Sequence, residues 1–289
     1  MSIERVRRLV EANNYEFIRG LFVGQMMRGE LDLPMLPEIA ARVVSVAGSP
    51  DADASGLARL ITGDQALAAH VMRVAKSAIY QPRHAIESLQ HAISWLGMAE
   101  VSDIAFTVAV QGKLLNVPGQ KARVQKMWKQ AVGTAQWARL VADTAGCQGE
   151  PSYLAGLLHE IGKPAALQAI AELSRRAATP LSDEEVDALV AEFHAAVGTQ
   201  LAASWKLPEA VVSVVGGWHN WAEATERKDA CATVYLAHHL AEHMLANSGS
   251  LAADALAADP VAAHFGWGLP EILGLCGHTE HVRAVIDGY

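Results

Sequence analysis

The sequence has few cysteines and no long apolar run. Its three cysteines, Cys147, Cys231 and Cys276, lie far apart and form no CxxC pair, which argues against a zinc knuckle, a thioredoxin-like motif and a disulfide framework. No stretch reaches the roughly 18 uninterrupted apolar residues that a membrane span needs. The segment 1–10 also lacks the apolar core of a signal peptide. We therefore expect no membrane partner and a cytoplasmic location.

A long basic block is missing as well. The chain carries 23 Lys and Arg against 31 Asp and Glu, a net charge of −8. An acidic surface repels phosphate backbones, and the most basic spot, Arg5 with Arg7 and Arg8, fits one solvated helical turn. We therefore expect no nucleic-acid partner.

The composition favours helices. Hydrophobic residues make up 51% of the 289 residues, enough for a sizeable core in one large domain or two closely joined ones. Alanine is abundant and runs of β-branched residues are short, and alanine loses no side-chain entropy on entering a helix. The expected fold class is all-α.

Breaks in the helical pattern divide the chain into four parts. Residues 1–32 form an N-terminal extension of one or two amphipathic helices, which Gly29, Pro34 and Pro37 end. Residues 33–115 form a first helical lobe and residues 116–246 a second, with the boundary inside 111–120. Residues 247–289 form a C-terminal helical segment. The prediction is a two-lobed helical bundle.

Five helices are predicted within the second lobe. One spans 121–145, and one begins at Pro151 and is interrupted by Pro164. Ser182 opens a third through a capping box with Glu185, and Pro208 is the first residue of the next. A further helix covers 229–246. The small, polar stretch 247–259 is predicted to be a loop or a frayed region.

One His–carboxylate pair stands out on the predicted helix 151–163. At about 100° per residue, His159, Glu160 and Lys163 fall opposite its apolar face. Such a pair can reach two metal ions because successive side chains diverge around a helix. Taken alone, however, the pair is more simply interpreted as a solvated face.

Three further histidines bear on this interpretation. His194 and His238 lie on or beside the apolar stripes of separate helices, so both should be largely buried. His219 follows the Gly216–Gly217 break, where a loop can direct it. Each alone could be a hydrogen-bonded core histidine. The set is equally consistent with a shared polar pocket, since unpartnered buried polar groups are costly.

The order of short motifs along the chain carries a family resemblance. They are Leu33-Pro34-x-Leu36-Pro37, Leu60-Ile61-x-x-Asp64, Val71-x-x-Val74-Ala75-x-Ser77, Ala92-Ile93-x-x-Leu96-Gly97, Gly156-Leu157-Leu158-His159-Glu160-Ile161-Gly162-Lys163, His194-x-x-x-Gly198, Trp205-x-Leu207-Pro208 and Trp218-His219. Over about residues 30–245 the chain resembles the HD superfamily of metal-dependent phosphohydrolases, and more closely the HDOD family of bacterial signalling domains. The resemblance implies an HD-like second lobe.

The departures from the enzyme pattern concern the metal ligands. Gln130 stands where active HD enzymes have a histidine, Glu160 replaces the bridging aspartate, and His238 aligns with a late aspartate. The resemblance therefore implies a vestigial metal site at His159, Glu160, His194, His219 and His238, with Gln130, Lys163 and Trp218 as pocket neighbours. The HDOD family is regarded as a degenerate, non-hydrolytic relative of the HD enzymes. The resemblance therefore implies that the chain has no catalytic residue.

Two functions compete on this basis. The first is a non-catalytic signal-transduction or adaptor module, whose partners are other signalling proteins or a nucleotide-type small ligand. The second is a residual metal-dependent phosphohydrolase or phosphodiesterase. The first requires no cofactor, although imidazole ligands could still hold one divalent transition metal. A third interpretation concerns His239 and His243, which could bind a metal on a surface helix. An exposed histidine pair of this kind is more simply interpreted as incidental.

Three tryptophans are predicted to have packing roles. Trp128, Trp205 and Trp218 each occupy a motif position beside a pocket segment, and each would bury a large apolar area.

Overall fold

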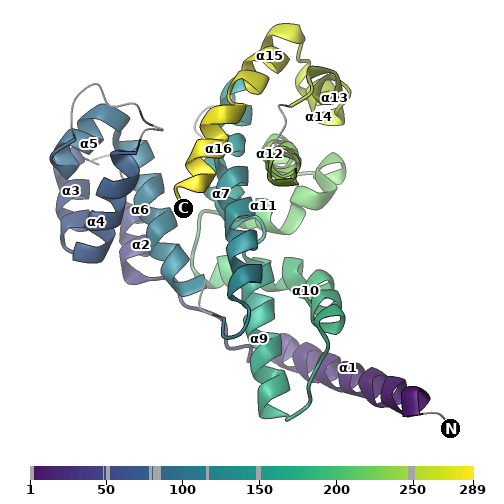
Figure 1. Ribbon diagram of the computed structural model, residues 1–289. Coiled ribbons are helices and arrows are strands. Elements are labelled where there is room, and N and C mark those ends of the chain that lie inside the picture. Colours follow the sequence, from purple (N-terminus) through teal and green to yellow (C-terminus); the bar gives the residue numbers. More distant parts are fainter. Residues whose placement is uncertain are drawn as a thin grey trace.

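The computed structural model describes residues 3–47, 49, 53–77, 80, 86–114, 117–147, 151–246 and 251–289. These residues contain helices and no strand, which confirms the all-α prediction. The N-terminal extension is one helix, α1 (Ile3–Arg28), which packs on α9 and α10. Its N-terminal end projects away from the rest of the molecule (Figure 1). The buried Ile18 and Phe22 anchor its other half.

The first lobe is built from five helices. They are α2 (Glu38–Ala47), α3 (Ala54–Thr62), α4 (Gln65–Ala75), α5 (Leu89–Leu96) and α6 (Met98–Leu114). Side-chain caps begin three of them, because Asp53, Asp64 and Ser88 each accept a hydrogen bond from a backbone N–H that the first helical turn leaves unpaired. Among the described residues, no single helix is long and apolar enough to cross a membrane, and only the bent pair α5 and α6 passes by length and composition together.

The second lobe surrounds one long helix. Its elements are α7 (Lys121–Thr144), α8 (Ser152–Leu158), α9 (Gly162–Arg176), α10 (Asp183–Ser204), α11 (Glu209–Gly217), the 3-10 helix η2 (Trp218–Glu223) and α12 (Lys228–Ala246). The predicted start and end of α7 agree with the structure to one residue. The capping box of Ser182 and Glu185 is present at the start of α10. The predicted boundary between residues 115 and 116 lies outside the described residues.

The predicted helix 151–163 is wrong in one respect. The chain leaves helix α8 after Leu158, turns through residues 159–161 and begins α9 at Gly162. Pro164 therefore lies in the first turn of α9, where its missing N–H costs no hydrogen bond, rather than at the point where a helix ends.

The C-terminal segment lies along the second lobe. It contains α13 (Ala253–Ala257), α14 (Pro260–Phe265), α15 (Leu269–Gly277) and α16 (Thr279–Asp287). Helix α13 corrects the prediction of a loop over 247–259, of which residues 247–250 lie outside the described residues. Helix α16 packs against α7 and brings the C-terminus between the two lobes (Figure 1).

The three predicted packing tryptophans are all buried. Trp128, Trp205 and Trp218 are 5%, 7% and 2% exposed. The indole Nε1 of Trp205 donates to the carbonyl oxygen of Pro34 at 2.8 Å, which ties the second lobe to the start of the first.

Candidate functional site

The turn between α8 and α9 places the His–Glu pair at the centre of the second lobe. A close contact between α9 and α10 fixes this turn. A Cβ on Gly162 would lie 1.8 Å from the carbonyl oxygen of His194 and 2.6 Å from the amide nitrogen of Gly198. Only glycine allows this approach, which also brings His194 toward Glu160.

His159 is fully inside the protein. It is 2% exposed, so the expectation that it lies opposite the apolar face of one continuous helix is wrong; the turn after Leu158 directs it inward. Its Nδ1 lies 2.6 Å from the carbonyl oxygen of Gly156. A carbonyl oxygen can only accept, so Nδ1–H is the donor and the Nε2 lone pair faces the pocket.

His238 forms a hydrogen bond with that lone pair. Its Nδ1 lies 2.9 Å from His159 Nε2, which confirms that these two side chains meet. Given the tautomer of His159, Nδ1–H of His238 is the donor in this contact. Gln130 supports His238 from α7, because its Nε2 donates to the backbone oxygen of His238 at 2.9 Å. His238 is partly buried, slightly less than predicted.

Glu160 is paired with a cation from its own chain segment. Lys163 Nζ forms an ion pair with Glu160 Oε1, and the Glu160 side chain is only 11% exposed. The other carboxylate oxygen of Glu160 lies 4.0 Å from His159 Nε2. The only carboxylate of the predicted metal site is thus already engaged by an ammonium group.

His194 and His219 form a second contact. Their Nε2 atoms are 3.4 Å apart. Nδ1 of His194 lies 3.0 Å from the carbonyl oxygen of Ala191, so Nδ1–H is the donor in that contact. His194 is partly buried and His219 is exposed. His194 belongs to this pair rather than to the group around His159.

The potential ligand atoms form two overlapping groups. One contains His159, Glu160 and His238, and the other contains Glu160, His194 and His219; within each group the ligand atoms lie within 4.8 Å of one another. All five predicted metal residues therefore fall into these groups, which share Glu160.

A third group was missed from the sequence. It joins His238 to His239 and Glu242 on the outer face of α12. The spacing of three residues between His239 and Glu242 is the signal that could have pointed to it.

Trp218 separates the two histidine pairs. Its ring centroid lies 3.7 Å from that of His219, 4.6 Å from that of His238 and 4.9 Å from that of His159. The indole is 2% exposed, so it removes water from one side of these imidazoles.

Burial keeps the inner imidazoles, those of His159 and His238, neutral near pH 7. Desolvation lowers the pKa of His159 to about 4 and that of His238, which also faces His159, to about 3. Desolvation and the neighbouring His194 lower the pKa of His219. For Glu160, burial opposes ionisation, but His159 and Lys163 outweigh it and lower its pKa to about 2. Because His159 is neutral near pH 7, Lys163 is the cation that holds the charged carboxylate.

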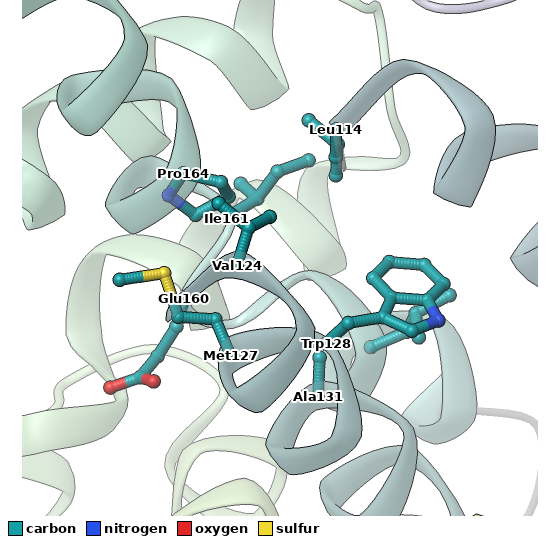
Figure 2. Close-up of a pocket in the computed structure, with 9 residues that line it drawn as sticks. Leu114, Val124, Met127, Trp128, Ala131, Glu160, Ile161 and Pro164 are labelled. Atoms are coloured by element: carbon teal, nitrogen blue, oxygen red, sulfur yellow. The ribbon is translucent and has the colours of Figure 1, made fainter. Parts of the chain in front are cut away.

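A small hollow adjoins Glu160 on the side of α7. Figure 2 shows apolar side chains around it, with the Glu160 carboxylate at one edge pointing away from Trp128. Its volume of about 20 Å³ suits a single water molecule and is too small for a nucleotide.

Comparison with known proteins assigns the family. A model of the HDOD domain matches residues 33–221, more than half of the chain. The chain belongs to the HDOD family. A protein from Treponema pallidum (strain Nichols), whose function is uncharacterized, is 26% identical to this HDOD chain over 216 residues. That match covers 72% of this chain and 42% of the relative, so the chain spans less than half of the relative's length.

Solved structures share the HDOD fold. A candidate metal-dependent phosphohydrolase from Shewanella amazonensis SB2B has a TM-score of 0.71 at 20% identity and covers 95% of this chain and 99% of its own. An HDOD domain protein of unknown function from Geobacter sulfurreducens has a TM-score of 0.71 at 22% identity, with 96% and 99% covered. A candidate signal transduction protein from Marinobacter aquaeolei VT8 has a TM-score of 0.68 at 24% identity, covering 95% of this chain and 66% of that one.

Within the HDOD fold, this donor set fits one transition-metal ion better than two metal ions. Each donor group offers two imidazoles and one carboxylate, a combination that suits zinc, iron, copper or nickel. Two divalent ions would have to share a single carboxylate that is already paired with Lys163. The residues present therefore do not fit a dinuclear hydrolase centre.

Proposed function

We propose that this HDOD protein is a signal-transduction or adaptor module that acts by binding a protein or a small ligand, without hydrolysing phosphate esters. The observation that carries the proposal is the internal pairing of the site. His159 is hydrogen-bonded to His238, and Glu160 is ion-paired with Lys163. The groups that would hold and balance metal ions satisfy one another.

Charge balance supports the proposal. Phosphodiester hydrolysis on an HD-type scaffold needs a metal-bound hydroxide, and a cation must lower the pKa of the bound water from 15.7 toward about 7. The Glu160 and Lys163 charges cancel, and the inner imidazoles are neutral near pH 7. Two divalent ions would therefore lie in a largely buried pocket with almost no opposing protein charge, which is costly.

The ligand chemistry points the same way. The neutral amide of Gln130 is a weaker ligand than an imidazole, and its Nε2 is committed to the backbone oxygen of His238. The side chain of Glu160 is one methylene longer than that of aspartate. This difference exceeds the roughly 0.5 Å placement that a catalytic centre tolerates.

A hydrolysis assay tests the proposal. Wild-type protein and His159→Ala are each supplied with manganese, magnesium, iron or zinc and offered cyclic dinucleotides and a model phosphodiester. The expected result is no difference between the two proteins. Metal-dependent turnover by the wild type that His159→Ala abolishes would overturn the adaptor proposal.

The second candidate function is a residual metal-dependent phosphohydrolase. The overlap of the two donor groups at Glu160 favours it, because a shared carboxylate is the arrangement of a bridged metal pair. The combined variant Gln130→His, Glu160→Asp and His238→Asp would then restore an existing activity. Under the adaptor proposal it raises metal affinity in a calorimetric titration, and the wild type shows no turnover for it to restore.

The proposed partners are other signalling proteins or a nucleotide-type small ligand. The proposed location is the cytoplasm. The three cysteines form no disulfide among the described residues, which supports this location because a reducing compartment disfavours disulfides.

A further inference from the structure

A second polar centre lies between the two lobes, apart from the histidine site. It belongs to a cleft of about 630 Å³, within the range of small-molecule sites. Helices α2 and α6 of the first lobe line it on one side, and α7 and α8 of the second lobe on the other. Its walls are largely apolar and include Val44, Phe106, Leu154 and Pro208. None of the residues of the histidine site lines it.

The floor of this interlobe cleft carries more negative than positive charge. Arg139 forms ion pairs with both Glu100 and Asp103, so one guanidinium serves two carboxylates. Glu100 also accepts a hydrogen bond from the Tyr80 hydroxyl at 2.7 Å. The Asp103 carboxylate pairs with Arg139 and has no counterpart to the Tyr80 hydrogen bond of Glu100 among the described residues. Asp103 lines the cleft together with Asp143.

Arg139 carries one positive charge and cannot neutralise both carboxylates. Its guanidinium carbon lies 4.6 Å from the centroid of the Tyr153 ring, which holds the group in place between the lobes. Burial raises the pKa of Asp103 to about 7, although Arg139 acts in the opposite direction. A second cation near Asp103 would relieve this deficit of positive charge.

Ser102 adds an unsatisfied acceptor beside Asp103. It lines the cleft, is 4% exposed, and its hydroxyl has no hydrogen-bond partner among the described residues. A buried hydroxyl without a partner is unfavourable, so a ligand that supplies a donor here gains a hydrogen bond.

We propose that the interlobe cleft binds a small organic cation, with a primary ammonium group at Asp103 and an apolar body between Val44 and Leu154. Asp103 supplies the charge, and Ser102 can accept one of the three N–H bonds of the ammonium. The apolar walls cover the rest of the ligand. A phosphate or carboxylate would meet Asp103 and Asp143 and is repelled, so a nucleotide is not the ligand of this cleft.

Three probes with one apolar body test the charge requirement. Calorimetric titration compares 2-phenylethylamine with 2-phenylethanol and phenylacetate on the full chain. The expected result is binding of the amine at least about tenfold tighter than either other probe, as a charge-assisted hydrogen bond requires. Equal binding of the three, or no binding of the amine, overturns the proposal.

Variants locate the site. Asp103→Asn should weaken amine binding at least about tenfold while leaving the alcohol unchanged, because only the charge is lost. Asp187→Asn, which removes a carboxylate of α10 outside the cleft, serves as the matched control and should bind like the wild type. Unchanged amine binding by Asp103→Asn overturns the proposal. Circular dichroism checks that each variant is folded.

A second variant covers the case in which Asp103→Asn does not fold. Ala47 lines the cleft at the exposed end of α2, where a larger side chain can be accommodated. Ala47→Trp should fill the cleft and abolish amine binding. Amine binding that survives in this variant places the ligand elsewhere and contradicts the proposal. Both outcomes are independent of whether the histidine site hydrolyses phosphodiesters.

Discussion

Replacing Gly162 by alanine should destabilise the protein strongly and disturb the histidine site. The new methyl group would lie 1.8 Å from the carbonyl oxygen of His194 and 2.6 Å from the backbone nitrogen of Gly198. Both obstacles are backbone atoms, so no side chain can move aside. Helices α9 and α10 must separate by more than an ångström to restore ordinary contact distances.

The cost follows from overpacking. Extra methyl groups in a well-packed interior typically cost about 1–3 kcal/mol through side-chain and small backbone shifts, and more where the backbone itself must move. We therefore expect Gly162→Ala to lower the free energy of unfolding by at least about 3 kcal/mol, the upper end of that range. The same movement carries His194 away from Glu160.

Urea denaturation followed by circular dichroism measures the effect. Gly20→Ala is the matched control, because Gly20 lies on the exposed side of α1 with nothing within 4 Å of an added Cβ. There alanine should stabilise the helix by about 0.5–1 kcal/mol. Equal stability of Gly162→Ala and the wild type would show that α9 and α10 do not approach this closely, and would refute the packing described for the site.

Three further predictions concern stability. Trp205→Ala should cost about 3–5 kcal/mol in denaturant titrations, since the indole is 7% exposed and donates to Pro34; a near-neutral result would place it at the surface. The lowered pKa values of His159 and His238 mean that the unfolded chain binds protons first as the pH falls below about 6.5. Stability should therefore drop between pH 6.5 and 4 by up to about 1.4 kcal/mol per pH unit for each histidine, and a flat profile in thermal melts would contradict this. Tyr289→Phe should be neutral or stabilising, because the Tyr289 hydroxyl is buried without a partner among the described residues, and a loss above about 1 kcal/mol would reveal a hydrogen bond.

Local signals in the sequence predicted the helices of the second lobe well. The glycines and prolines around 118–146 give the bounds of α7, and the capping box of Ser182 and Glu185 gives the start of α10. These signals act within a few residues of chain, so they are readable without knowledge of the tertiary structure.

The details of the site depend on tertiary contacts and were not readable in this way. A helical wheel drawn over 151–163 assumes one straight helix, whereas the turn at 159–161 buries His159 and brings Lys163 onto Glu160. The pairing of His238 with His159, and of His194 with His219, requires three helices and η2 to be placed in space. The interlobe cleft around Asp103 gave no sequence signal, because its walls come from both lobes.

The number of metal ions bound per chain tests the central claim most directly. The claim is that Lys163 already balances Glu160, so that the histidine site cannot hold a metal pair. Purified protein is equilibrated with manganese, iron or zinc, separated from free metal, and measured by plasma mass spectrometry. The account predicts at most one ion per chain, held by imidazoles. Two tightly bound ions per wild-type chain, both lost in a variant that combines His159→Ala with His194→Ala, would contradict it.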